Sequence, residues 1–201
     1  MKSIDCIEIV KGLRANKFLE EKELAILQAT ESKDLWEVCV LLRVYTSPQS
    51  TDAEKIIKKN LQINNAEDNI SGDGVKNGIK YEIKVSVHDI KCKVNIRQIR
   101  PHHNIDFYII VAFNLFGGSK GEAYVFKIPA EVFYELVVHY GGYTHGTVSK
   151  NGIVTKESIS DKNTRHEYSL TADPNATFGN KSRELWDKLL VFKVAYTKDS
   201  F

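Results

Sequence analysis

Between residues 79 and 87, hydrophobic side chains recur at every second position, as in a β-strand that buries one face. Just before this stretch, Asn77-Gly78 predicts a type I′ turn, because both central residues of that turn need positive φ and Asn and Gly tolerate it best. The pattern therefore predicts a tight hairpin whose second strand is apolar on one face. That face carries Ile79, Tyr81, Ile83, Val85 and Val87.

Several other stretches show the pattern of helices. Apolar residues spaced by three and four predict helices over residues 1–45, 51–61 and 183–192. Thr51 and Glu54 have the spacing of a capping box, and Ser182 is predicted to cap the last helix. Pro129 is suited to open a further helix over residues 130–140, since its missing N–H is not needed in the first turn.

Strands are predicted over residues 91–99, 105–115 and 122–128. The second of these is apolar almost throughout, as in a strand buried on both faces. Another Asn-Gly pair, Asn151-Gly152, predicts a second hairpin over residues 147–158. The resulting order of elements indicates an α/β (α+β) fold with a central mixed β-sheet flanked by helices.

The chain of 201 residues, 42% of them hydrophobic, is long enough for one sizeable core, and we expect a single domain. Pro48 and its small polar neighbours mark the end of a helical N-terminal part, residues 1–48. A core over residues 49–140 and a loop-rich region with a C-terminal helix over residues 141–201 follow. The formal net charge of +2 and the pI near 8.3 permit a nucleic-acid partner without arguing for one.

The cysteines and the absence of long apolar runs suggest where the protein works. Cys6, Cys39 and Cys92 are odd in number and widely spaced, and they fit neither a disulfide framework nor a zinc site. The first residues are too charged for a signal peptide. The longest apolar run, residues 107–113, is far shorter than the roughly 20 residues that span a bilayer. We therefore predict a soluble, cytoplasmic protein with no membrane partner.

The polar face of the first hairpin carries the most specific chemistry. A two-residue turn at Asn77-Gly78 places Asp73 opposite Glu82, with their Cβ atoms about 4.5–5.5 Å apart. Carboxylates at that distance repel each other unless a proton or a cation joins them. Two carboxylates and a backbone carbonyl, such as that of Ile83, suit Mg²⁺ and leave room for water. Lys84, on the same face, can hold an attacking water, so the pattern predicts a magnesium site for phosphodiester hydrolysis.

Gly72-Asp73 followed by Glu82-Ile83-Lys84 resembles the motif of the PD-(D/E)xK nuclease superfamily, and within it looks like a type II restriction endonuclease. The resemblance covers residues 51 to about 128. It implies a restriction-endonuclease-like core in which Asp73 and Glu82 bind Mg²⁺ and Lys84 serves the attacking water. It also implies double-stranded DNA as the substrate and a homodimer that matches a palindromic site. One departure is plain, since Gly72 stands where the family usually has Pro.

Two more polar residues have alternative interpretations. Glu54 either completes the helix cap or leans toward the two carboxylates. Gln98 resembles a Gln that touches the site after the Glu-x-Lys strand in several such nucleases, but it is equally well explained as a polar residue of an edge strand. His102 and His103 are interpreted as solvent-facing loop residues rather than ligands or general bases.

Positive charge gathers along and after the hairpin, as binding to a phosphate backbone requires. The residues predicted to bind DNA are Lys80, Lys91, Arg97, Arg100, His145, Lys150 and Arg165. Three alternatives stay open. The protein could be a structure-specific repair or recombination nuclease, or a non-catalytic nucleic-acid-binding module. The hairpin face could also be a solvated surface with a cross-strand ion pair.

Overall fold

The computed structural model describes residues 49–68, 70–87, 93–115, 121–146, 152–161, 163 and 165–201. It also describes six isolated positions, all helical: Glu8, Gly12, Leu35, Trp36, Val38 and Cys39. Most of the predicted helical N-terminal part therefore lies outside the described residues. The same holds for Cys6, Lys91, Cys92 and Lys150.

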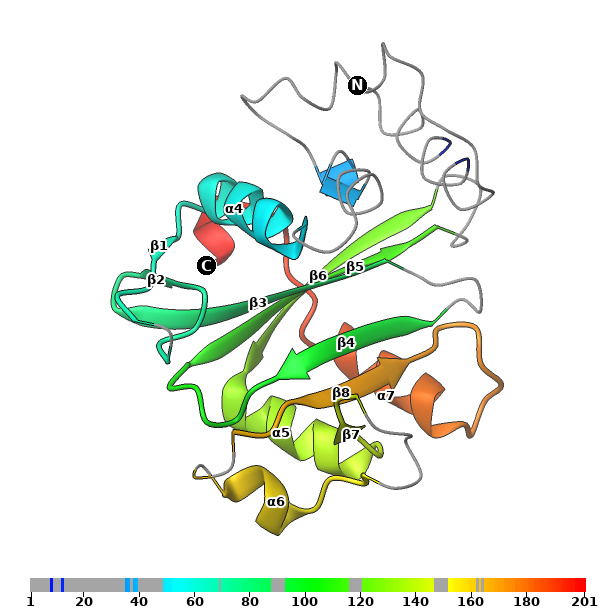
Figure 1. Cartoon of the computed structure of the whole chain (residues 1–201). Coiled ribbons are helices and arrows are strands. Elements are labelled where there is room, and N and C mark those ends of the chain that lie inside the picture. Colours follow the sequence, from blue (N-terminus) through cyan, green and yellow to red (C-terminus); the bar gives the residue numbers. More distant parts are fainter. Residues whose placement is uncertain are drawn as a thin grey trace.

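Five strands form a mixed sheet in the order β1-β2-β3-β5-β6 (Figure 1). The strands are β1 (Asn64–Asn65), β2 (Gly74–Lys76), β3 (Ile79–Val87), β5 (Phe107–Asn114) and β6 (Glu122–Pro129). β3 pairs antiparallel with β2 and parallel with β5, and β5 pairs antiparallel with β6. The predicted fold class, α+β with a central mixed sheet flanked by helices, is confirmed.

β4 (Val94–Ile99) leaves the central sheet and joins a second one, in the order β4-β8-β7. Its partner β8 (Tyr168–Ala172) also pairs with the short β7 (Tyr143–Thr144), and both pairings are antiparallel. Because β4 carries the chain back along the domain, β5 can lie parallel to β3. Both strands then begin at the same edge of the central sheet, where Tyr81 is opposite Phe107.

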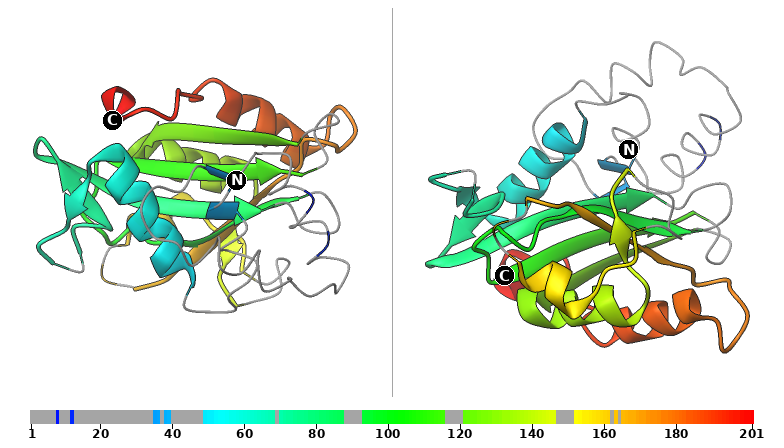
Figure 2. Two further views of the ribbon diagram at one scale, coloured as in Figure 1. Left: turned by 90° about the horizontal axis from the view of Figure 1, so that it is seen from above. Right: turned by 60° about the horizontal axis from the view of Figure 1, so that its bottom comes forward.

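Helices cover both faces of the central sheet (Figure 2). α4 (Gln49–Leu61) packs on one face, where Ile57 and Leu61 join the buried Tyr81 and Ile83. α5 (Ala130–His139) and α7 (Lys181–Leu190) pack on the other. The described chain also contains α6 (Lys156–Ser160) and a short 3₁₀ helix (Lys198–Ser200). Among the described residues, no helix combines the length and the apolar character needed to cross a membrane.

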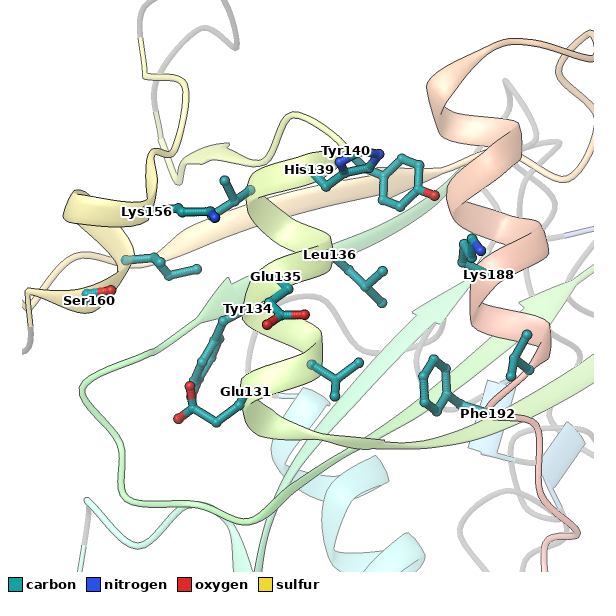
Figure 3. A pocket seen from close by; sticks show the side chains of 14 residues that line it. Glu131, Tyr134, Glu135, Leu136, His139, Tyr140, Lys156, Ser160, Lys188 and Phe192 are labelled. Carbon is teal, nitrogen blue, oxygen red and sulfur yellow. The ribbon is translucent and has the colours of Figure 1, made fainter.

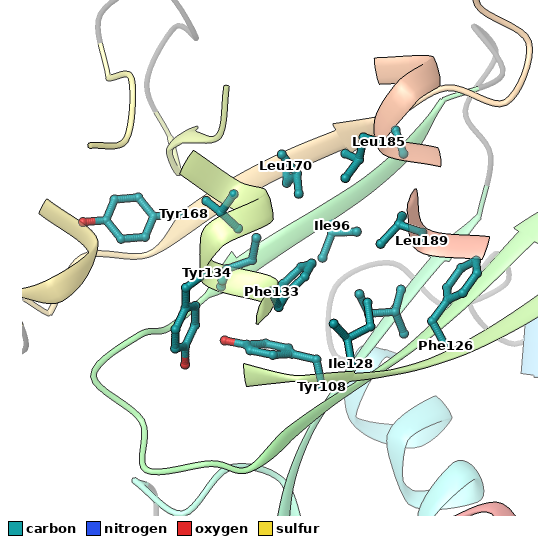
Figure 4. Close-up of a cluster of buried hydrophobic side chains, with 14 of the residues drawn as sticks. Ile96, Tyr108, Phe126, Ile128, Phe133, Tyr134, Tyr168, Leu170, Leu185 and Leu189 are labelled. Atoms are coloured by element: carbon teal, nitrogen blue, oxygen red, sulfur yellow. The ribbon is translucent and has the colours of Figure 1, made fainter. Parts of the chain in front are cut away.

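The face of the central sheet that carries Tyr108 builds the larger core, together with the second sheet, α5 and α7 (Figure 4). Tyr108 and Phe133 have ring centroids 4.6 Å apart, and Trp186 of α7 packs edge-on against Phe126. β5 is buried from Tyr108 to Asn114, which confirms the strand buried on both faces. The apolar face of β3 is confirmed as well, because Tyr81 and Ile83 are buried and Ile79, Val85 and Val87 pack against the same core.

Three local predictions differ from the structure. α4 begins at Gln49, so Thr51 lies inside the helix and the predicted capping box with Glu54 is wrong. The final helix begins at Lys181 because the Asn180 side chain, rather than Ser182, caps it, accepting a hydrogen bond from the Ser182 N–H. Both helices therefore start two residues earlier than predicted.

The second predicted hairpin is also wrong in the part that is described. Residues 156–160 form α6, and Thr155 caps this helix by accepting a hydrogen bond from the Ser158 N–H. The Ser158 hydroxyl in turn accepts one from the Thr155 N–H at 2.9 Å. This reciprocal cap satisfies two backbone N–H groups within the segment. The helix therefore needs no partner strand for these two hydrogen bonds. Asn151 of the predicted turn lies outside the described residues.

Candidate functional site

The first hairpin has the predicted register, with Lys76 opposite Ile79 and Gly74 opposite Tyr81. β2 begins at Gly74, so Asp73 lies just before the paired strand. Its backbone N–H donates to the Tyr81 carbonyl at 2.8 Å, and its carboxylate Oδ2 accepts from the Ile83 N–H at 2.6 Å. The Asp73 side chain thus takes the place of a strand partner beside β3. Asp73 therefore lies beside β3 near Glu82, but not in the directly opposed pair that the turn predicts, because its N–H donates to the carbonyl of Tyr81, which is already opposite Gly74.

Position 72 requires glycine because the backbone there lies very close to β3. Its φ is +76°, and a Cβ atom added to it would lie 2.6 Å from the Tyr81 carbonyl oxygen. Proline, whose φ is fixed near −65°, could not adopt this conformation. The departure from the family's usual Pro therefore follows from the local backbone, and it leaves the position of Asp73 intact.

Glu82 lies on the opposite face of β3 from Ile83, and its side chain is fully buried. The Lys84 ammonium is 2.6 Å from Glu82 Oε1, and Nδ1 of His103 is 3.2 Å from Oε2. Since a carboxylate can only accept, His103 carries its proton on Nδ1 in this contact. A nitrogen of the Arg100 guanidinium lies 3.9 Å from Oε1. A solvated hairpin face does not describe this glutamate.

His103 and Arg100 reach Glu82 because of the parallel pairing of β3 and β5. The loop between β4 and β5, residues 100–106, leads into the start of β5. Because β3 and β5 are parallel, the start of β3 lies at the same end of the sheet. Two backbone hydrogen bonds fasten the loop there, from the Asp106 N–H to the Lys80 carbonyl at 3.0 Å and from the Asn104 N–H to the Ile70 carbonyl at 2.8 Å. The prediction that His103 faces solvent is therefore wrong: its side chain is only 11% exposed.

The two carboxyl groups have pKa values shifted in opposite directions. Burial and the negative charges of Glu82 and Glu54 raise the pKa of Asp73 to about 6, although Lys84 and the Ile83 N–H oppose the shift. Burial also disfavours the charged form of Glu82. The hydrogen bond from His103 and the charge of Lys84 outweigh burial and lower the pKa of Glu82 to about 2. Above pH 6 both groups are ionised, and Asp73 then bears an unfavourable charge that a cation would relieve.

α4 contributes a second contact to Asp73. The Lys58 ammonium donates to the Asp73 carbonyl oxygen at 2.9 Å and forms an ion pair with Glu54 at 2.9 Å. Of the two interpretations of Glu54, the cap is excluded. Its charge nevertheless acts on Asp73, so Glu54 belongs to the acidic surroundings of that residue.

The residues present fit the divalent cation that the motif implies. The Ile83 N–H points to Asp73, and within a strand the N–H and C=O of one residue point to the same side, so the Ile83 carbonyl faces that side too. Asp73, Glu82 and this carbonyl offer the hard oxygen ligands that Mg²⁺ prefers. In the described part of the chain, no three His, Cys, Asp or Glu side chains form a metal-binding group by themselves. A cation here would complete its coordination with water and substrate oxygens.

The other predicted site residues are spread more widely. Gln98 is exposed, with φ at 55°, where the register of β4 and β8 shifts between Ile96 and Ile99, and it is not among the described partners of Glu82. Lys80 is half-buried beside Asp106, while Arg97 and Arg165 are exposed. Lys91 and Lys150 lie outside the described residues.

Sequence reasoning also missed Glu167. Its carboxylate accepts from Arg100 Nε at 2.7 Å, and its backbone carbonyl accepts from the His145 N–H at 2.7 Å. Two of the predicted DNA-binding residues, Arg100 and His145, are therefore brought together at one acidic residue. The pairing of β8 with β4 places Glu167 beside Arg100, and the pairing of β8 with β7 places it beside His145. No local sequence signal predicts these pairings.

A groove of about 900 Å³ lies elsewhere, between α5, α6 and α7 (Figure 3). Its lining combines apolar side chains, such as Leu136 and Phe192, with charged ones, such as Glu135 and Lys188. Asp73, Glu82 and Lys84 are not part of its lining. The candidate site is therefore a cluster of buried charges that lies outside this groove.

Comparison of the chain with protein-family profiles, with curated proteins and with solved structures yields no match. The resemblance to the nuclease motif accordingly rests on the residues of this chain alone. The geometry of Asp73, Glu82 and Lys84 is the basis on which a function can be argued.

Proposed function

We propose that the protein is a Mg²⁺-dependent endonuclease that hydrolyses phosphodiester bonds of double-stranded DNA, in the manner of a type II restriction enzyme. The observation that carries this proposal is the convergence of Asp73, the fully buried Glu82 and Lys84 beside the first residue of β2. Burying Glu82 beside Lys84 and a second acid, Asp73, costs folding free energy. Groups with pKa values perturbed in this way are typical of functional sites. The proposed location remains the cytoplasm.

Each residue has a definite task in this chemistry. Asp73, Glu82 and the Ile83 carbonyl would hold Mg²⁺, which when bound supplies positive charge at the phosphate and a water of lowered pKa. Lys84, whose side chain is 13% exposed, would donate hydrogen bonds to the attacking water and to the phosphate oxygens on which negative charge develops. His103 fixes the second oxygen of Glu82, so the carboxylate keeps one orientation.

The partners in this proposal are double-stranded DNA and a second copy of the chain. The gathering of Arg100, His145 and Lys84 supports a phosphate backbone as ligand. One active site cuts one strand at a time. A two-fold symmetric homodimer would therefore cut both strands of a palindromic site.

The test is cleavage of plasmid DNA with Mg²⁺ and with EDTA. Asp73→Asn keeps an acceptor for the Ile83 N–H but removes the charge, so we expect at least about a hundredfold loss of cleavage. Lys84→Met and Glu82→Gln should lose cleavage as well. Asp106→Asn is the matched control, because Asp106 also accepts from a β3 N–H, that of Lys80, at 2.8 Å but is exposed. Full activity of Asp73→Asn would refute the proposal.

DNA cleavage and calorimetry distinguish the alternative functions. Discrete fragments from long duplex DNA support restriction, whereas cleavage confined to branched or nicked DNA supports a repair role. If calorimetry detects no Mg²⁺ binding even with DNA present, the protein is a non-catalytic binding module.

A further inference from the structure

The ion pair of Arg100 and Glu167 lies beside the buried charges. Arg100 Nε is 2.7 Å from Glu167 Oε1, and their side chains are 28% and 31% exposed. Another nitrogen of the same guanidinium is 3.9 Å from Glu82 Oε1. Arg100 therefore connects an accessible carboxylate with the buried one. Exposed pairs stabilise a fold by only about 0–1 kcal/mol, so stability alone explains this arrangement poorly.

Basic residues from different parts of the fold act on Glu167. Although burial opposes its ionisation, the hydrogen bond and charge of Arg100, with His145 and Lys84, lower the pKa of Glu167. His145 is tied in place twice, by its N–H to the Glu167 carbonyl at 2.7 Å and by Nδ1 to the Ser169 hydroxyl at 2.9 Å. Lys84 comes from β3, Arg100 from the β4–β5 loop and His145 from the end of β7. Lys84, Arg100 and His145 thus form a basic cluster beside Glu167.

We propose that this cluster, Lys84, Arg100 and His145, binds a backbone phosphate of the DNA strand, and that the Glu167 carboxylate occupies the phosphate position until DNA displaces it. The inference rests on the proposed function. An arginine fork fits carboxylate and phosphate alike, and phosphate carries more charge and more acceptor oxygens than one glutamate. Glu167 therefore keeps Arg100 oriented while making DNA binding weaker than the cationic cluster alone would allow.

The chain provides a matched pair for comparison. Arg183 and Asp187 of α7 form another arginine–carboxylate pair, at 3.2 Å, with side chains 37% and 46% exposed. Removing either acid changes the net charge equally. Only removal of Glu167 frees an arginine that lies beside Glu82.

The experiment measures binding of the full-length protein to a labelled duplex by fluorescence anisotropy in EDTA, over a range of salt concentrations. We expect Glu167→Gln to bind about fivefold more tightly than wild type and to gain about one unit in the slope of log K against log salt. Arg100→Gln should bind more weakly and lose about one unit of slope. Asp187→Asn should change binding by less than about twofold, since an isolated exposed charge contributes little.

Two variants make the result decisive. Glu167→Gln combined with Arg100→Gln should bind no more tightly than Arg100→Gln alone, because Glu167 acts through Arg100. Arg100→Lys keeps the charge without the fork and should recover only part of the affinity. Circular dichroism confirms that each variant is folded. Glu167→Gln binding no more tightly than Asp187→Asn, or no DNA binding by any variant, would overturn the inference.

Failure of the proposed function gives a different result. Absence of Mg²⁺-dependent cleavage together with tighter binding by Glu167→Gln would leave the phosphate site standing in a protein that is not a nuclease. Cleavage by the wild type with unchanged binding by Glu167→Gln would refute the phosphate site alone.

Discussion

The two sides of the candidate site hold similar carboxyl groups in opposite electrostatic surroundings. On the α4 side, Asp73 has Glu54 and Glu82 as charged neighbours, and its pKa rises to about 6. On the side of the β4–β5 loop, Glu82 is paired with Lys84 and His103, and its pKa falls to about 2. Burial disfavours ionisation at both positions, so burial does not explain the difference. Burial prevails at Asp73, where two acids add to it, whereas His103 and Lys84 outweigh burial at Glu82.

The largest effect should follow from removing the buried charge on the loop side. Glu82→Gln leaves the Lys84 ammonium, only 13% exposed, without its carboxylate. We expect a loss of about 3–5 kcal/mol in the free energy of unfolding at pH 7, because breaking a buried pair strands one charge. Urea denaturation at pH 7 measures this loss.

The pH dependence of that loss has a definite direction. The folded pKa of Glu82, about 2, lies below the usual glutamate value of 4.5, so its contribution to stability is complete above pH 4.5 and disappears as the pH falls toward 2. The difference between wild type and Glu82→Gln should shrink over the same range. Adding Lys84→Met to Glu82→Gln should restore part of the stability, since no unpaired charge remains. An equal loss at pH 7 and pH 3 would contradict the electrostatic explanation.

A smaller effect of opposite sign should appear on the α4 side. The folded pKa of Asp73, about 6, lies above the usual aspartate value of 3.8, so ionised Asp73 destabilises the fold as the pH rises from about 4 through 6. Asp73→Asn should therefore be more stable than wild type by about 1–3 kcal/mol at pH 8 in EDTA, and equal to it near pH 4. Denaturation at both pH values checks this, with Asp106→Asn as the control. A destabilised Asp73→Asn protein at pH 8 would show that Asp73 gains more from its contacts than it loses by repulsion.

The smallest effect should come from adding Mg²⁺. At ten times the dissociation constant, a cation bound only by the folded protein contributes about 1.4 kcal/mol. In a domain of this size that corresponds to a rise in Tm of about 3–6 °C. The rise should be present at pH 8, smaller at pH 5 where Asp73 is protonated, and absent in Asp73→Asn. Thermal denaturation followed by circular dichroism measures it, and an equal rise in Asp73→Asn would place the cation elsewhere.

The hairpin and its two acids could be predicted from the sequence because the information is local. The Asn77-Gly78 turn sets the register, and the register determines that Asp73 lies beside the start of β3. The strand buried on both faces was recognisable for a similar reason, since its own residues are apolar almost throughout.

The remainder of the site depends on pairings between distant strands. Nothing in residues 91–99 shows that β4 leaves the central sheet, and that departure makes β3 and β5 parallel and brings His103 to Glu82. Glu167 joins Arg100 only because β8 pairs with β4. At residues 156–160 the local signal was misread, because the reciprocal cap of Thr155 and Ser158 outweighed the expectation from the Asn-Gly turn.

The pairing of β4 with β8 has a consequence for how the protein is made. These strands are far apart in the chain, and contacts of this kind form late because a long loop must close first. A ribosome synthesising the protein releases Lys84 and Arg100 well before Glu167 has been added. Arg100 therefore lacks the Glu167 carboxylate as a partner until synthesis has passed residue 167 and β8 has joined β4.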